Sequence, residues 1–444
     1  MNLKIELSES QRKEYQKNLM PFWSKGNGIH LKGGKGVYLE DIQGKKYLDI
    51  TTQMFANYLG FGNEEIAEAI FDQAKNLTTV HPQFETDLRL SLVNKLANIA
   101  PKQLNRVSFS SGGGPANESA MKIALKNVPG SKNFITMWGA YHGDTFTTAA
   151  ATFESTLTQA PYGNTTVLFE YIANLNNIFV RVPHPYCYRC PLNLQKDTCG
   201  IACADLLRST IKNGVVGPLA GIILEPIQSA GGQFPFPKEY LIRARTICDE
   251  FGSVLIFDEI QTSCRTGEWF AAEYFDVEPD VITFGKGLGA GVPISGIIIH
   301  DRLKPFEDLM EDLHTFQNNH IGYAAALKTI EIIERDNLLE HTKKMGHYFT
   351  KKLVDLQKEF PEIGDIRGPG LKIGVELVID PVSIQPIPRA TTDKILAKAI
   401  EKGLFFQITG ESIIKIKPAL IIQEKEIDEA IGIISESMKE VLRK

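Results

Sequence analysis

Six short apolar runs recur through the middle of the chain, and helical patterns separate several of them. The runs lie at 107–111, 133–137, 221–226, 253–260, 281–285 and 296–300. Continuous apolar strands that alternate with helices are typical of a mostly parallel sheet whose two faces are both covered. The sequence therefore predicts an α/β fold. Functional residues should lie directly after the runs, because ligands bind at the carboxyl ends of such strands.

The two ends of the chain follow different patterns. Residues 1–60 combine a short helix with apolar residues that alternate between glycine turns, as in a β-meander. Residues 322–358 predict one long helical stretch, and short strands and helices alternate after it. We expect a large domain over 61–325, a small α+β domain over 326–444, and an N-terminal segment that packs with the small domain.

The composition excludes several classes of protein. Among 444 residues, 48 Lys and Arg against 53 Asp and Glu give a net charge of −5, whereas nucleic-acid-binding proteins normally carry a basic face. No apolar run approaches the roughly 18 residues that a membrane helix needs. The polar N-terminus lacks the apolar core of a secretory signal. We expect a cytoplasmic protein that binds neither nucleic acid nor membranes.

Three glycines follow the first apolar run and open a helix. Gly112, Gly113 and Gly114 allow backbone N–H groups to point at an anion, and the helix dipole favours negative charge there. The pattern indicates a phosphate site, although a tight turn without a ligand explains these residues equally well.

Three residues at or directly after the ends of later runs can reach the same edge of the sheet. Tyr141 can stack on a planar ligand. Asp258 would be a buried carboxylate that needs a cation. Desolvation would make the amine of Lys286 a nucleophile. Taken singly, each has a structural explanation: packing of Tyr141 with His142, a capping or ion-paired Asp258, and a solvated Lys286.

The joint pattern describes a site for pyridoxal 5′-phosphate. The phosphate would lie at the helix N-terminus, and the ring would lie between Tyr141 and Ile260. The ring nitrogen would pair with Asp258, and Lys286 would hold the aldehyde.

Longer motifs extend this pattern over nearly the whole chain. The segment at 255–296 looks like the long signature of one family, and other motifs follow in that family's order: SSGGGPANESAMKIA, GAYHGDT, ILEPIQSAGG, HTFQNN and IRGPGLKIGVEL. On these motifs the chain resembles the class III, or ω-type, aminotransferases. The resemblance implies fold type I of the pyridoxal-phosphate enzymes: a large domain with a mostly parallel mixed sheet, and a smaller α+β domain.

The resemblance also implies roles for residues around the cofactor ring. Lys286 is expected to form the Schiff base with the cofactor and to move the proton, and Asp258 to keep the ring nitrogen protonated. Tyr141 and Ile260 are expected to cover the two faces of the ring. Gln261 is expected to form a hydrogen bond with the phenolic oxygen.

Further residues are implied around the phosphate and the substrate. Gly113 and Gly114 should offer backbone N–H groups to the phosphate, and His142 belongs to the cofactor-binding set. Thr315 should reach the phosphate of the neighbouring subunit, because the family builds its site across a homodimer. Glu225 should lie at the edge of the site, where it can gate a substrate carboxylate.

Two departures from the family concern the phosphate and the substrate. Gly114 stands where many members have Ser, and Pro115 stands for the usual Glu, which leaves Ser111 as a substitute hydroxyl. Lys415 stands where the family usually has an Arg for a substrate carboxylate. Because lysine cannot bind a carboxylate in the bidentate manner of arginine, the substrate is expected to carry a different anion or to be held elsewhere.

A third departure is a cysteine cluster with the spacing C-x2-C-x8-C-x3-C. Four thiolates so close in sequence can bind zinc, but a loop of reduced cysteines, a disulfide, or a loop that shapes the substrate entrance are the alternatives. The cluster consists of Cys187, Cys190, Cys199 and Cys203.

These observations predict an aminotransferase that passes an amino group from an amine or amino acid to a keto acid or aldehyde through Lys286. The alternative is a lyase (an ammonia- or phospho-lyase) or an amino acid epimerase on the same scaffold, which the Lys415 departure favours. Only a transaminase needs a second, carbonyl substrate. A non-enzymatic scaffold is a third possibility that the preserved cofactor residues disfavour.

Overall fold

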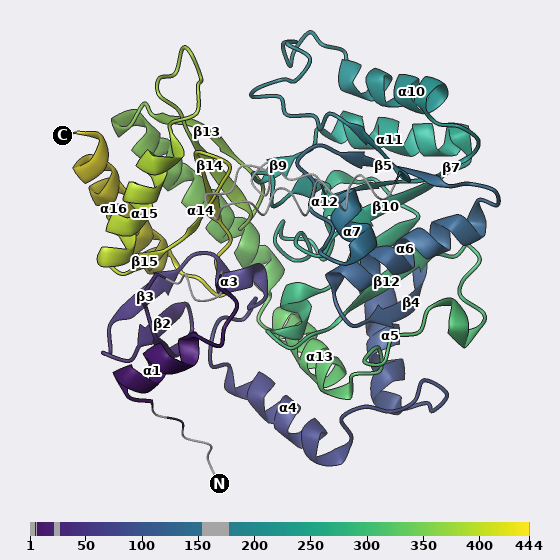
Figure 1. Cartoon of the computed structure of the whole chain (residues 1–444), viewed down its shortest axis with the longest axis horizontal. Coiled ribbons are helices and arrows are strands. Elements are labelled where there is room, and N and C mark those ends of the chain that lie inside the picture. Colours follow the sequence, from purple (N-terminus) through teal and green to yellow (C-terminus); the bar gives the residue numbers. More distant parts are fainter. Residues whose placement is uncertain (1–4, 6, 22–26, 153–176, 444) are drawn as a thin grey trace.

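The computed structural model describes residues 5, 7–21, 27–152 and 177–443 of the chain. Its largest element is a seven-stranded sheet with the strand order β4-β12-β11-β10-β7-β5-β6 (Figure 1). The strands are β4 (Leu104–Ser110), β5 (Asn133–Met137), β6 (Phe179–Val182), β7 (Leu219–Leu224), β10 (Val254–Asp258), β11 (Val281–Phe284) and β12 (Ser295–His300).

Side chains of this sheet alternate between two covered faces. In β10, Leu255 and Phe257 pack in one hydrophobic cluster, and Val254 and Ile256 pack in another. The first cluster includes α5, α10, α11 and α13, and the second includes α6 and α7. Both faces are therefore buried, as the apolar runs predicted. The helices are α4 (Glu64–Asn76), α5 (Asp87–Ile99), α6 (Gly113–Asn127), α7 (Phe146–Ala151), α10 (Ala202–Gly214), α11 (Lys238–Phe251), α12 (Ala271–Phe275) and α13 (His320–Arg335).

One strand of the sheet runs against the others. β12 pairs antiparallel with both β11 and β4, whereas β10 pairs parallel with β11 and β7, and β5 pairs parallel with β6 and β7. The sheet is mixed but mostly parallel, in agreement with the expected architecture. The carboxyl ends of β5, β7, β10 and β11 therefore lie at one edge.

Two four-stranded sheets form the other half of the molecule (Figure 1). The N-terminal meander is continued by a strand from near the C-terminus, because β15 pairs with β3. The four strands of this first sheet are β1 (Leu31–Lys35), β2 (Tyr38–Asp41), β3 (Lys46–Asp49) and β15 (Leu404–Phe405). The second sheet has the order β13 (Ile363–Arg367), β14 (Ile373–Leu377), β17 (Ile413–Ile416), β16 (Gln407–Thr409).

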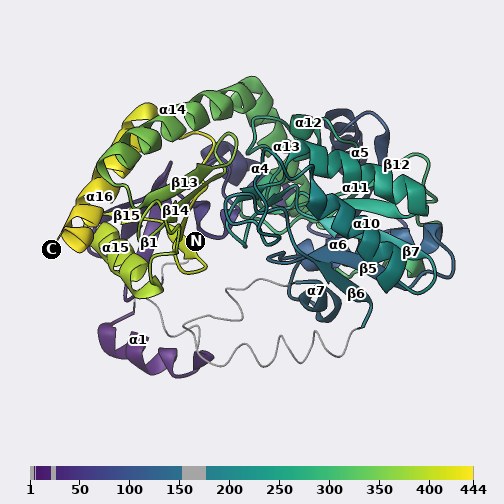
Figure 2. The same ribbon diagram turned by 90° about the horizontal axis from the view of Figure 1, so that it is seen from above.

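The remaining helices surround these two sheets, and α14 lies beside α16 (Figure 2). One hydrophobic cluster joins the meander to the C-terminal residues, with Leu48 and Ile50 packed among residues beyond 330. The helices are α1 (Glu9–Gln16), the short α3 (Thr52–Phe55), α14 (Leu338–Glu359), α15 (Arg389–Glu401) and α16 (Glu424–Leu442). Short elements complete the description: β8 (Ile227–Gln228), β9 (Phe234–Pro235), and the 3-10 turns η1 (Lys286–Gly289) and η2 (Leu309–Glu311).

The long helix predicted over 322–358 is two helices. α13 ends at Arg335 and α14 begins at Leu338. Between them Asn337 has φ +50°, in the left-handed region that asparagine tolerates better than most residues. The prediction of one continuous helix was wrong because apolar spacing continues across the break. None of the described helices combines the length and the apolar character needed to cross a membrane.

Candidate active site

A cavity of about 180 Å³ lies at the edge of the seven-stranded sheet where β5, β7, β10 and β11 end. Nine of the ten residues predicted to bind the cofactor line it, and Thr315 does not. The lining residues are Gly113, Gly114, Asn117, Tyr141, His142, Gly143, Asp144, Glu225, Asp258, Ile260, Gln261 and Lys286.

Asp258, the last residue of β10, is held by two polar neighbours. Its Oδ2 atom accepts a hydrogen bond from Asn117 Nδ2 at 2.8 Å and lies 2.8 Å from His142 Nδ1. Burial alone would raise the pKa of Asp258, but the bonds from His142 and Asn117, together with nearby Lys286, lower the pKa below its ordinary value. Asp258 is thus an ionised carboxylate that suits a cationic ring nitrogen. Sequence reasoning missed Asn117, which lies one turn into α6.

Lys286 is presented by a strained turn. Its φ is +47°, in a region that residues other than glycine rarely adopt. A Cβ atom on the next residue, Gly287, would overlap the ring of Tyr58, so this ring holds the turn in place. Burial lowers the pKa of Lys286, although Asp258 and Glu225 oppose the shift. The amine is therefore closer to its neutral, nucleophilic form than a surface lysine is.

The N-terminus of α6 forms another wall of the cavity. Gly113 and Gly114 line the cavity in the first helical turn, and the N-cap residue Gly112 has no side chain that could cap this turn. First-turn N–H groups have no partner within a helix, and the helix dipole favours an anion there. The wall therefore suits a phosphate group.

The space beside this turn is filled by side chains of α7. Ser111 is exposed and does not line the cavity, and its role as a substitute hydroxyl stays a prediction. A Cβ atom on Gly114 would lie 3.0 Å from Thr145 Cγ2 and 3.2 Å from Thr148 Oγ1. Thr148 Oγ1 accepts the backbone N–H of Thr145 at 3.1 Å. The side chains that cap α7 thus fill the space a residue larger than glycine would need.

Glu225 links the segment after β5 to the segment after β7. Its Oε1 accepts the backbone N–H of Tyr141 at 3.0 Å, and its Oε2 accepts that of Ser229 at 2.8 Å. Burial raises the pKa of Glu225, and the charge of Asp258 adds to the rise. The Oγ atom of Ser229 is in turn hydrogen-bonded to Lys372 Nζ. Glu225 therefore connects Tyr141 with a buried lysine that sequence reasoning missed.

Ile260 and Gln261 follow Asp258 on the same wall. Ile260 packs over the glycine turn, since a Cβ atom on Gly113 would lie 3.0 Å from Ile260 Cδ1. Gln261 Oε1 accepts a hydrogen bond from Lys417 Nζ at 2.8 Å. With its carbonyl end engaged, the amide nitrogen of Gln261 is the end that can donate into the cavity.

Three lysines of the C-terminal sheet lie behind this wall. Lys372 and Lys417 are fully buried, and Lys415 is 9% exposed. The Nζ atoms of Lys415 and Lys417 lie 5.4 Å and 3.2 Å from the centroid of the Phe55 ring. The sequence singled out only Lys415, although residues two apart on a strand face the same side and so pointed to Lys417. Nothing in the sequence pointed to Lys372, because most lysines lie on the surface in contact with solvent.

Thr315 lies outside the cavity. It is exposed, and its neighbour Phe316 is 64% exposed. Its role toward a neighbouring subunit therefore stays a prediction.

The four clustered cysteines are free thiols that line a small cavity of about 20 Å³. Burial raises the pKa of Cys187, and it raises that of Cys203 to about 11, so both favour the thiol form. Among the described residues, no group of three or more His, Cys, Asp or Glu side chains is placed to hold a metal ion. The zinc interpretation of Cys187, Cys190, Cys199 and Cys203 is therefore not supported.

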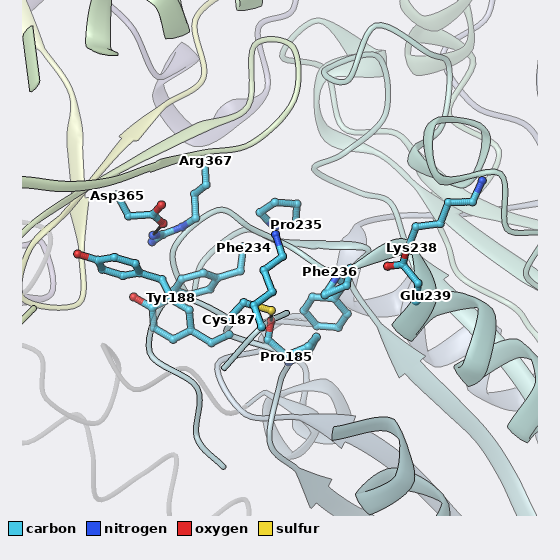
Figure 3. Close-up of a pocket in the computed structure, with 13 residues that line it drawn as sticks. Pro185, Cys187, Tyr188, Phe234, Pro235, Phe236, Lys238, Glu239, Asp365 and Arg367 are labelled. Atoms are coloured by element: carbon cyan, nitrogen blue, oxygen red, sulfur yellow. Dashed lines mark hydrogen bonds and ion pairs between the residues drawn. The ribbon is translucent and has the colours of Figure 1, made fainter. Parts of the chain in front are cut away.

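The cysteine loop also borders a larger cavity of about 610 Å³ (Figure 3). Cys187 and Tyr188 contribute to one wall, and Phe234 and Arg367 come from other segments. The Arg367 guanidinium lies 4.1 Å from the centroid of the Phe234 ring and pairs with Asp365 at 2.6 Å. This loop thus lines a cleft against the C-terminal sheet.

The smaller cavity fits pyridoxal 5′-phosphate. Its helix N-terminus suits the phosphate, Asp258 suits the ring nitrogen, and Lys286 suits the aldehyde carbon. The glycine wall is tightly packed: a Cβ atom on Gly143 would lie 2.6 Å from Thr148 Oγ1 and 2.7 Å from Gly114 Cα, so Gly143 lets the segment after β5 approach the α6 N-terminus closely.

Comparison with known proteins identifies the family. A sequence model of the family described as aminotransferase class-III matches residues 22–438. A transaminase from the marine bacterium Virgibacillus has a closely similar structure, with a TM-score of 0.85, 28% identity, and coverage of 98% of this chain and 99% of that chain.

Relatives with three different activities are similar over most of the chain. Leucine/methionine racemase of Thermococcus litoralis is 31% identical over 418 residues, which cover 92% of this chain and 90% of that protein. (R)-1-hydroxy-2-aminoethylphosphonate ammonia-lyase of Vibrio splendidus is 30% identical, with 93% and 86% covered. Acetylornithine aminotransferase of Methanocaldococcus jannaschii is 31% identical, with 93% and 94% covered.

The family match spans nearly the full chain, and the fold is that of solved transaminases. The chain therefore belongs to the class III aminotransferases, which are pyridoxal-phosphate-dependent enzymes of fold type I.

Proposed function

We propose that this enzyme moves an amino group from an amine or amino acid donor to a keto acid or aldehyde acceptor, with Lys286 as the residue that binds the cofactor. One observation carries the proposal: Lys286, Asp258 and the glycine turn of α6 line a single cavity. These groups come from three separate strand ends. Their convergence is what a reaction that uses pyridoxal phosphate requires.

When bound, pyridoxal phosphate supplies an electron sink for negative charge at the substrate carbon. The chain's own residues would do the rest. The α6 N-terminus would hold the phosphate, and Asp258 would keep the ring nitrogen protonated. Lys286, whose pKa burial lowers, would move the proton between the substrate carbon and the adjacent carbon of the cofactor. Gln261, oriented by Lys417, would donate to the phenolic oxygen.

Borohydride trapping tests this assignment. Protein prepared with vitamin B6 should be yellow, and reduction should fix the mass of the cofactor on the peptide that contains Lys286. The Lys286→Ala variant should lose the trapped mass and turnover, whereas Lys394→Ala, a change at an exposed lysine of α15, should keep both. Undiminished turnover and an unaltered absorbance in Lys286→Ala would sink the assignment.

A lyase or epimerase reaction is the second candidate. Lys415 occupies the place where the resembling family has its carboxylate-binding arginine, and relatives include a racemase and an ammonia-lyase. The discriminating measurement is whether turnover of an amine needs an added keto acid or aldehyde. A transaminase stops after one turnover without it, whereas a lyase or an epimerase continues.

We further infer a cytoplasmic homodimer whose sites lie at the subunit interface. Its support is a run of exposed apolar side chains next to Thr315, namely Met310, Leu313 and Phe316, of the kind that a partner subunit covers. The six free cysteines suit a reducing compartment.

A further inference from the structure

Asn117 joins three separate segments of the large domain at the cofactor cavity. It is fully buried, lines the cavity, and lies one turn into α6 on the same helical face as Gly113 and Gly114. Its Nδ2 atom donates to the backbone oxygen of His142 at 2.7 Å and to Asp258 Oδ2 at 2.8 Å. One amide group thus connects the helix that suits the phosphate with the segment after β5 and with the last residue of β10.

Asn117, His142 and Asp258 form a closed polar triangle. His142 Nδ1 lies 2.8 Å from the same Oδ2 atom, so His142 contacts Asp258 through its ring and Asn117 through its backbone. The other oxygen of Asp258, Oδ1, accepts longer bonds, from the backbone N–H of Ile260 at 3.2 Å and from Thr283 Oγ1 at 3.3 Å. Asn117 and His142 are therefore the closest donors that fix the position of this carboxylate.

The amide of Asn117 can take only one orientation in this triangle. Both acceptors of Nδ2 are oxygen atoms, so a flipped amide would place Oδ1 against two oxygens. The Oδ1 atom is buried and has no hydrogen-bond partner within the described part of the chain. A buried unpaired acceptor costs free energy, and an apolar side chain at this helical position would avoid that cost. The two donated bonds therefore give the amide a role that packing alone does not explain.

The amide also differs from the ionisable groups around Asp258. His142, Lys286 and Glu225 all face this carboxylate, and their charges depend on pH. An amide does not titrate. The hydrogen bond from Asn117 therefore holds the carboxylate whichever charges these three groups carry.

We propose that Asn117 is a positioning residue, which holds the Asp258 carboxylate in place for the ring nitrogen of the cofactor. The inference rests on the proposed function, because protonation of this nitrogen matters only to a reaction that uses pyridoxal phosphate. Through α6, the same amide fixes Asp258 relative to Gly113 and Gly114, so the nitrogen end and the phosphate end of the site keep their spacing. Without the amide, the carboxylate loses one of the two donors to Oδ2 and stabilises a protonated ring nitrogen less well.

Nitrogen NMR tests this role on the holoenzyme, with an isotopic label at the ring nitrogen of the cofactor. In Asn117→Ala, the midpoint of ring deprotonation should fall by about 1–2 pH units, as expected for losing a hydrogen bond to a charged group. Asn117→Leu, which keeps the branched shape without the N–H groups, should behave in the same way. The control Asn213→Ala removes two hydrogen bonds at an exposed position of α10 and should leave the midpoint unchanged. An unchanged midpoint in the Asn117 variants would overturn the proposal, even if both unfold at a lower temperature.

Kinetics separate this inference from the proposed function. L-alanine, β-alanine and propylamine are each added to the holoenzyme with pyruvate as the acceptor. With an amine that the wild type accepts, Asn117→Ala should lower kcat about 10- to 100-fold and change KM less than about threefold, because the contact acts after the amine binds. A raised KM with unchanged kcat would overturn the proposal. If no amine reacts while the NMR midpoint still falls in Asn117→Ala, the role of Asn117 stands and the proposed aminotransferase function falls.

Discussion

Charging a buried lysine costs free energy, and for Lys372 this cost should appear in the pH dependence of protein stability. Burial lowers its pKa from 10.5 to about 7, with Glu225 opposing the shift and Arg265 and Lys286 adding to it. Between pH 7 and 10 the unfolded chain binds a proton at this site that the folded chain does not. Stability therefore rises with pH over this range.

Lys372→Met removes this dependence. The free energy of unfolding of the wild type should rise relative to that of the variant between pH 7 and 10, by up to about 4 kcal/mol. Urea unfolding of both proteins at pH 7, 8.5 and 10 measures the difference. A constant difference across the range would mean that Lys372 titrates as an ordinary surface lysine does.

Gly114 is a second residue whose surroundings decide the effect of a change. Gly114→Ser restores the family's usual side chain, yet its Cβ atom would lie 3.2 Å from Thr148 Oγ1. We expect Gly114→Ser alone to weaken cofactor binding, because the turn must shift. The double change with Thr148→Ala should recover part of the loss, about 1 kcal/mol, because the contact of the new Cβ atom with Thr145 Cγ2 at 3.0 Å remains. Fluorescence titration of the apoprotein with pyridoxal phosphate gives both affinities. Tighter cofactor binding by Gly114→Ser alone would show that the Thr148 hydroxyl can move aside without a free-energy cost.

At the scale of elements, α3 has the most strained backbone beside the buried lysines. Thr52, Gln53 and Phe55 all have positive φ values, of +54°, +57° and +67°. Asp49 holds this segment: Oδ1 accepts the backbone N–H of Thr51 at 2.8 Å, and Oδ2 accepts that of Gln53 at 3.0 Å. The strained turn in turn carries the Phe55 ring beneath the lysines.

Asp49→Asn should loosen this turn, because its amide group would present N–H to backbone N–H. We expect the free energy of unfolding to fall by about 2–3 kcal/mol. The matched control is Asp197→Asn at an exposed position, which should leave the stability unchanged. Chemical denaturation measures the difference. Equal stability of Asp49→Asn and the wild type would contradict the role given to Asp49.

Elements were predictable from sequence where apolar side chains alone define them. The run at 133–137 coincides with β5, because both faces of that strand are buried. Strand direction was not predictable, since burial on two faces gives β12 the same pattern as its parallel neighbours. The break at Asn337 was missed because a single backbone dihedral ends α13 without interrupting the apolar spacing.

The same contrast holds for the site. Lys286, Asp258 and the glycine turn were predictable because each stands at or directly after the end of an apolar run. Lys417 was indicated only by its place two residues after Lys415. Lys372 was not predictable, because most lysines are solvated and only the folded structure shows that it is buried.

At the scale of the whole molecule, the proposed dimer requires that each site borrow Thr315 from the partner. Two defective proteins should then complement each other. Lys286→Ala lacks its own amine but supplies Thr315, and Thr315→Ala does the reverse. Random exchange of subunits should restore about a quarter of the wild-type sites.

The readout is the amount of cofactor retained after dialysis. Thr315→Ala alone should lower the affinity for the cofactor about tenfold and so retain less of it. Unmixed variants handled in the same way are the control. Retention in the exchanged sample that equals the average of the two unmixed samples would contradict a shared site.

The cofactor cavity and the buried lysines belong to different sheets, and this has a consequence for how such enzymes diversify. Residues after β5, β10 and β11 line the cavity, whereas Lys372 and Lys417 flank β14 and β17. Lys417 nevertheless donates to Gln261, and Lys372 is bonded to Ser229, whose backbone N–H Glu225 accepts. Descent through a change at either lysine must therefore preserve the coenzyme site or compensate within it.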